Sequence, residues 1–183
     1  MLEAIRIYST AKGYAQSAYL IVTSPHRYQV PDDTTFILPY HMLLGFAVEL
    51  YLKAYSTYTG HPDSELRGAD MRHNLGKLLE LNENDGFNLP AAKKLADYLG
   101  EQHRTFEYRY MKPDSSYFVR WQAEVFGELN ELDIYVDDRI GASASHGKAP
   151  SSGWSVPADQ NGWRVPKEFE STVVGGVAVP QAG

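Results

Sequence analysis

The sequence predicts an all-α protein, an antiparallel bundle of about five helices followed by a poorly structured C-terminal tail. Apolar residues recur at intervals of three and four throughout residues 1–140, which is the spacing of one helix face, and never alternate over any length. Proline and glycine divide this part into segments of helix length with short connections. Long helices with short connections favour antiparallel packing.

The two longest predicted helices lie near the N-terminus. The first covers about residues 2–23 and ends at Ser24–Pro25, because proline disfavours a helical conformation at the residue before it. The second begins near Pro39, which a first helical turn tolerates, and Gly60 suits the position just beyond its end. Its expected buried face comprises Tyr40, Leu43, Leu44, Ala47, Leu50, Tyr51, Ala54 and Tyr58.

Two shorter helices should follow. The third is expected over about residues 71–81, with Asp70 as its N-cap, because a short side-chain oxygen there can accept from a free backbone amide. The fourth should have Asn88 as its N-cap and Pro90 in its first turn. Its apolar face comprises Ala91, Leu95, Tyr98, Leu99 and Phe106.

The fifth helix should begin at Asp114 or Ser115, after the break at Pro113. Its apolar face comprises Phe118, Trp121, Val125, Leu129, Leu132 and Val136.

The composition changes beyond the last predicted helix. All 13 tyrosines occur at or before Tyr135, whereas glycine, alanine, serine, proline and valine dominate from Gly141 onward. We therefore assign residues 1–140 to a folded domain and residues 141–183 to a tail that is disordered or loosely docked. This tail should be dispensable for folding, although its two tryptophans could dock a partner.

Composition excludes several classes of function. A chain of 183 residues can bury a core unaided, and the absence of cysteine excludes disulfides, thiolate zinc sites and cysteine nucleophiles. A net charge of −6 argues against a broadly basic nucleic-acid surface. We find no long apolar run and no leader pattern, which predicts a cytoplasmic protein without membrane contact.

Motifs for cofactors and metals are also missing. The phosphate-loop, dinucleotide and nucleophile-elbow patterns do not occur, so we predict no cofactor. His61 and Asp63 lie near His73 in sequence but lack a metal-ligand spacing, so we predict no metal site.

Two polar groups are candidates for ligand binding. Arg72, His73 and Asn74 open the third predicted helix, where free amides attract anions, although His73 or Asn74 could simply satisfy the turn. Arg109 lies between two tyrosines, and an arginine beside aromatic rings can recognise phosphate or bases. Arg109 could equally pair with Glu107, Asp114 or another acid while the rings of Tyr108 and Tyr110 fill the end of the bundle. We therefore predict a candidate anion or RNA site that comprises Arg72, His73, Asn74, Arg109 and Tyr110.

A further pattern spans the second and third helices. It consists of a Glu-x-x-Leu-Lys-Ala run from Glu49 to Ala54, then Gly60, a polar loop, and a His-Asn-Leu-x-x-Leu run from His73 to Leu78. Glu49 lies four residues before Lys53, an arrangement in which the ion pair stabilises a helix by roughly 0.2–0.5 kcal/mol. The two side chains could also bind a ligand or partner.

This pattern resembles the HEPN superfamily of small helical bundles. The resemblance implies a homodimeric binding or dimerisation module, in a prokaryotic or phage defence or toxin–antitoxin setting, with RNA, a nucleotide or a protein as partner. It also implies an alternative, a divergent metal-independent ribonuclease, since catalytic members carry an Arg and a His separated by four to six residues. Two pairs have that spacing here, Arg139 with His146 and Arg67 with His73.

Overall fold

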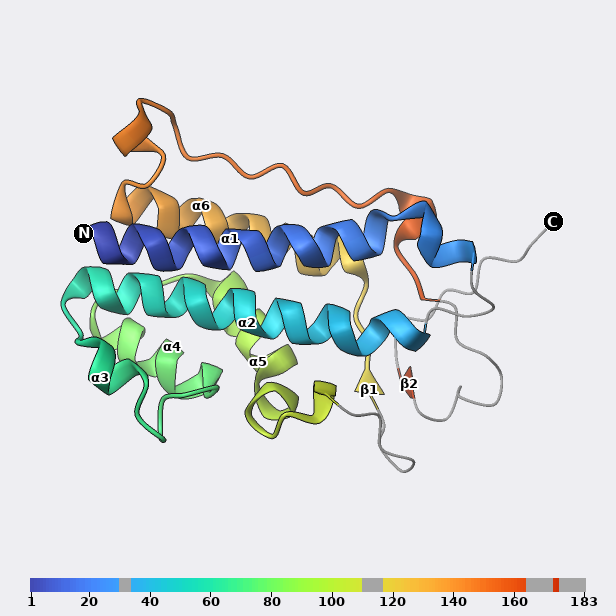
Figure 1. Ribbon diagram of the computed structural model, residues 1–183, viewed down its shortest axis with the longest axis horizontal. Helices are drawn as coiled ribbons and strands as arrows, with labels where there is room; N and C mark the ends of the chain where they lie inside the picture. Colours follow the sequence, from blue (N-terminus) through green and yellow to red (C-terminus); the bar gives the residue numbers. More distant parts are fainter. Residues whose placement is uncertain (30–33, 110–116, 164–172, 175–183) are drawn as a thin grey trace.

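The computed structural model describes residues 1–29, 34–109, 117–163 and 173–174, which form a helical bundle (Figure 1). Five helices of ten or more residues build it: α1 (Leu2–Thr23), α2 (Thr34–Thr59), α4 (Leu75–Asn84), α5 (Pro90–Arg104) and α6 (Gln122–Ile140). The predicted all-α bundle is confirmed.

Shorter elements connect and extend these helices. They are η1 (Pro25–Gln29), α3 (Asp63–Leu66), η2 (Glu107–Arg109), η3 (Ala144–His146) and η4 (Ala158–Gln160). Two short strands, β1 (Tyr117–Phe118) and β2 (Val173–Val174), pair in parallel.

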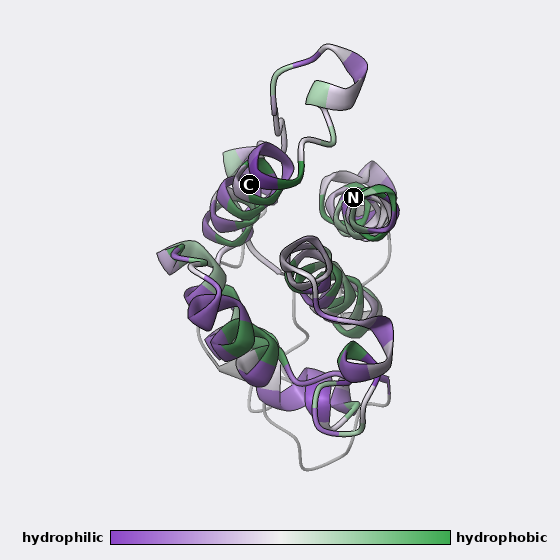
Figure 2. Ribbon diagram, turned by 90° about the vertical axis from the view of Figure 1, so that its left-hand side faces the viewer, coloured by the Kyte–Doolittle hydropathy of each residue, from purple (hydrophilic) through white to green (hydrophobic). Residues whose placement is uncertain are grey.

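The central element is α2, which packs against α1, α4, α5 and α6. Figure 2 looks along the bundle and shows α2 between α1 and the α4–α5 pair, with hydrophobic ribbon facing inward. On α1 the buried positions include four alanines, which allow a close approach between the antiparallel helices α1 and α2. These alanines are Ala4, Ala11, Ala15 and Ala18.

Among the described residues, α2 is the one helix that is long and apolar enough to span a membrane, over Phe36–Thr59. The most apolar window of this segment is 56% buried inside the bundle, as is common for the core helix of a globular protein.

Several predicted helix boundaries are wrong. Helix α2 begins at Thr34, so Pro39 lies inside the helix and not in its first turn. The N-cap of α4 is Asn74 and not Asp70, because His73 has a φ of 60° and cannot continue a right-handed helix. Leu89, not Asn88, precedes α5.

The last helix also starts later than predicted. Helix α6 begins at Gln122, and Asp114 and Ser115 lie outside the described residues.

Four side chains of the segment 142–163, those of Ala142, Trp154, Val156 and Trp163, are buried in the core, contrary to the expectation of a disordered tail. Trp154 and Trp163 are buried, with Trp163 fully so. The Trp154 indole donates to Gln16 Oε1 at 2.9 Å, and the Arg27 guanidinium lies 4.3 Å from the ring centre of Trp163. The boundary at residue 140 therefore does not separate core from tail; residues 164–172 and 175–183 lie outside the described residues.

Candidate functional site

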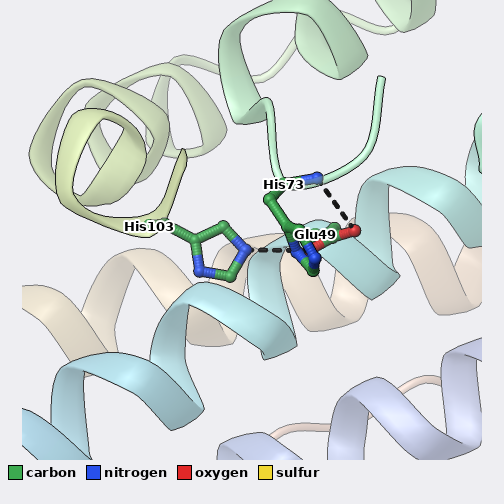
Figure 3. Close-up of side chains that lie close together, drawn as sticks. All are labelled: Glu49, His73 and His103. Atoms are coloured by element: carbon green, nitrogen blue, oxygen red, sulfur yellow. Dashed lines mark hydrogen bonds and ion pairs between the residues drawn. The ribbon is translucent and has the colours of Figure 1, made fainter. Parts of the chain in front are cut away.

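A buried carboxylate with two imidazole partners is the most unusual polar feature of the bundle. Glu49 lies on α2 and is 4% exposed. Its Oε2 atom accepts from Nδ1 of His73 at 2.9 Å and from Nε2 of His103 at 2.8 Å (Figure 3). Its Oε1 atom accepts from the Lys53 ammonium at 2.7 Å and from the backbone amide of His73 at 3.4 Å.

These contacts keep Glu49 ionised. Burial alone would raise the pKa of Glu49, but hydrogen bonds from His103 and Lys53 and the Lys53 charge outweigh it, so the pKa is held well below its ordinary value. An ionised carboxylate only accepts hydrogen bonds, so both imidazole nitrogens facing it are donors. The free nitrogen of His73 is therefore Nε2, which has no hydrogen-bond partner among the described residues.

Three separate parts of the chain build this cluster. Glu49 comes from the middle of α2, His73 from the connection before α4, and His103 from the last turn of α5. The approach of His103 to α2 depends on Gly45, because a Cβ atom at that position would lie 2.4 Å from His103 Nδ1. A glycine one helical turn before Glu49 thus makes room for the second imidazole.

Aromatic rings enclose the cluster. The Phe46 ring lies edge-on to His103, with ring centroids 5.2 Å apart. Phe106 packs against His73 at 4.6 Å, and its φ of 59° turns the chain back toward the cluster just after α5. These rings limit the access of water to Glu49, so His73 is its most exposed partner.

His73 borders two hollows in the surface. One has a volume of about 410 Å³ and the other about 370 Å³, and both include Arg72 and His73. The first is also lined by Ala69, Asp70, Asn74, Lys77, Arg104 and Phe106. The second is also lined by Glu3, Ile7, Glu49, Leu50, Lys53, Asp63, Leu66 and Arg67.

The structure brings together part of the site predicted from the sequence. Arg72, His73 and Asn74 line the first hollow, where Asn74 Oδ1 also caps α4 by accepting from the backbone amide of Lys77 at 3.2 Å. Arg109 does not line this hollow; its guanidinium stacks 4.2 Å from the Phe106 ring centre beside a separate narrow crevice. Tyr110 lies outside the described residues.

The two arginine–histidine pairs differ in placement. Arg67 and His73 line the same hollow, although the Arg67 side chain pairs with Asp63. Arg139 lies over the Tyr135 ring at 4.7 Å, while the exposed His146 bonds to Ser145 and to the Ala142 carbonyl. Neither Arg139 nor His146 lines either of the two hollows that His73 borders.

Sequence reasoning missed His103 and treated Glu49 as half of a helix-stabilising pair with Lys53 that could also bind a ligand or partner. Glu49 lies opposite the predicted apolar face of its helix, so its burial could not be predicted from local spacing. Comparisons of the chain with protein-family models, characterised proteins and solved structures find no significant match.

Proposed function

We propose that the chain is a HEPN-like binding module that holds a phosphate-bearing ligand, RNA or a nucleotide, in the hollow at the start of α4. One observation carries this proposal. Arg72, Lys77 and Arg104 converge with His73 around a single hollow, in a protein whose net charge is −6. A cluster of cationic side chains in a protein with a net negative charge favours an anionic ligand at that place.

The existing contacts of these cations leave them available. The Arg72 side chain forms no hydrogen bond or ion pair with a described residue. Lys77 pairs with Asp70 at 3.5 Å and Arg104 with Glu101 at 2.9 Å, both near the surface. Exposed ion pairs of this kind contribute little, so phosphate can replace the carboxylate partner.

The N-terminus of α4 lies beside the same hollow, which Asn74 and Lys77 line. The first amides of a helix have no partner within the helix. Asn74 caps the amide of Lys77, which leaves those of Leu75 and Gly76 at the N-terminus of α4 for a ligand.

The test is binding of a labelled single-stranded RNA, of ADP and of inorganic phosphate to the full chain. We expect the double variant Arg72→Gln/Lys77→Gln to weaken binding at least tenfold and to reduce its salt dependence. A matched control is Arg6→Gln/Lys93→Gln, which removes two exposed cations elsewhere. Equal affinity of the two double variants would contradict the proposal.

A second candidate function is RNA cleavage, favoured by the orientation of His73. Its Nδ1 donates to the buried Glu49, which leaves the Nε2 lone pair available beside Arg67 and Arg72. A carboxylate that orients an imidazole in this way prepares it to act as a general base. We expect His73→Ala to abolish any cleavage of RNA and His146→Ala to leave it unchanged; the opposite result would transfer the role to the Arg139–His146 pair.

A further inference from the structure

We infer that Glu49, His73 and His103 form a binding site for one divalent transition-metal ion of the Zn²⁺ type. Among the described residues, this is the one place where three metal-binding side chains converge, with one ligand atom from each lying within 4.8 Å of the other two. The inference rests on these donor atoms and not on the cations of the proposed phosphate site, although His73 borders both.

The donor set suits a borderline metal. Two imidazole nitrogens and one carboxylate oxygen form the three-ligand set typical of open zinc sites. Mg²⁺ and Ca²⁺ prefer oxygen donors and larger numbers of them, so this cluster should discriminate against both.

The donor atoms must rearrange to hold a tetrahedral metal ion. Zinc bonds of about 2.0–2.1 Å with tetrahedral angles place ligand atoms about 3.3 Å apart. The Glu49 oxygen now lies 2.9 Å from His73 Nδ1 and 2.8 Å from His103 Nε2. Both separations must therefore widen by about 0.5 Å, and the two imidazole nitrogens, which lie within 4.8 Å of each other, must reach the same separation by side-chain rotation.

The protons also balance. Each imidazole carries a proton on the nitrogen that faces Glu49, and metal binding requires that nitrogen to present a lone pair. A ring that is neutral moves its proton to its other nitrogen, Nε2 in His73 and Nδ1 in His103, and a protonated ring releases one proton to water. Glu49 is already ionised and releases none.

One carboxylate oxygen is available to a metal. Lys53 and the His73 amide bind Oε1, which leaves Oε2 as the single carboxylate ligand. The fourth coordination position would open past His73 toward the two hollows.

The positive charge of Lys53 should weaken metal binding by electrostatic repulsion, because its ammonium group lies 2.7 Å from Glu49 Oε1. Replacing that charge with an apolar chain of similar length should therefore tighten metal binding. Lys53→Met thus tests the electrostatics of the site without removing a ligand.

The experiment is calorimetric titration of ZnCl₂ into the full, untagged chain after treatment with a chelator, with MgCl₂ in a parallel titration. We expect one Zn²⁺ per chain and no Mg²⁺ binding. His103→Gln and Glu49→Gln should each weaken Zn²⁺ binding by at least about 100-fold, more than the 10–100-fold typical of residues that only orient ligands. Lys53→Met should strengthen it.

A matched control is His61→Gln. His61 contacts Glu65 and Asp85 at the surface, but it does so with opposite ring nitrogens, so its partners do not converge on one point. This variant should bind Zn²⁺ as the wild type does. Zn²⁺ binding that His61→Gln removes, or that Glu49→Gln and His103→Gln leave intact, would overturn the inference, as would the absence of binding.

Two further measurements guard against a variant that fails to fold. The absorption spectrum of the Co²⁺-loaded wild type should show tetrahedral coordination, and a six-coordinate spectrum would argue against the site. His73→Gln changes the most exposed ligand and should weaken binding with the fold intact. The variant Arg72→Gln/Lys77→Gln should keep Zn²⁺ binding, so the two proposals fail independently.

Discussion

At the scale of single residues, burial of a carboxylate does not by itself mark a functional site in this protein. Asp133 and Asp137 are both fully buried on α6. Asp133 accepts from Lys12 at 2.8 Å and from Tyr51 at 2.7 Å, and Asp137 accepts from Tyr8 at 3.1 Å, so these acids join helices within the core. Glu49 differs because two of its partners are imidazoles and because it borders an open hollow.

The small size of Gly45 should be necessary for the cluster. We expect Gly45→Ala to destabilise the fold by about 1–3 kcal/mol, because the new methyl group overlaps His103 Nδ1. Chemical denaturation measures this change. The matched control is Gly13→Ala on α1, where a Cβ meets nothing within 4 Å and should stabilise the helix by about 0.5–1 kcal/mol. A neutral Gly45→Ala would mean that His103 can move away freely.

His41 should make stability depend on pH. It is buried and bonds to the Ile37 carbonyl and to the Tyr98 hydroxyl, both at 2.6 Å. Burial lowers the pKa of His41 from 6.5 to about 4, whereas the unfolded chain takes up this proton near pH 6.5. Protonation of His41 therefore does not lower the free energy of unfolding above pH 6.5. As the pH falls from 6.5 toward 4, the unfolded chain binds the proton and the folded chain does not, so the free energy of unfolding decreases by roughly 3 kcal/mol in total.

Denaturation at several pH values checks this expectation. His41→Gln should flatten the decline between pH 6.5 and 4, and His146→Gln, at an exposed position, should not. Identical curves for wild type and His41→Gln would show that another group controls acid sensitivity.

At the scale of elements, helix existence could be predicted from spacing, but helix ends and the site could not. Apolar periodicity is local, and it located the five main helices. The start of α4 depends on the backbone of His73, which has a positive φ and contacts Glu49, a residue 24 positions away. His103 lies 54 positions from Glu49, so their contact arises from the packing of α5 on α2 and leaves no trace in local sequence.

The segment 142–163 should behave as a structural element, although it contains no long helix. We expect Trp163→Ala to cost about 3–5 kcal/mol, because it removes a fully buried ring that packs against Tyr40 and Arg27. The measurement is chemical denaturation. Tyr58→Ala is the comparison, since that ring is 46% exposed and its loss should change stability by less than about 0.5 kcal/mol. A small effect of Trp163→Ala would restore residue 140 as the limit of the core.

At the scale of the whole molecule, we expect self-association into a homodimer. A hollow of about 510 Å³ that is bordered by Leu89, Ile134, Tyr135 and Pro150, together with Glu131 and Asp138, supports this expectation. Light scattering at tens of micromolar should give twice the mass of 20.5 kDa. A monomer across that range would remove dimerisation from the proposed function.

The left-handed backbone at His73 has a consequence for how this protein would diverge. A non-glycine residue in that region costs of the order of 1 kcal/mol, and glycine or asparagine adopts it most easily. Drift toward the most stable sequence would therefore place glycine or asparagine at position 73. Retention of histidine among orthologues would mean that selection acts on the imidazole, and its replacement would identify lineages that keep the bundle after losing the activity.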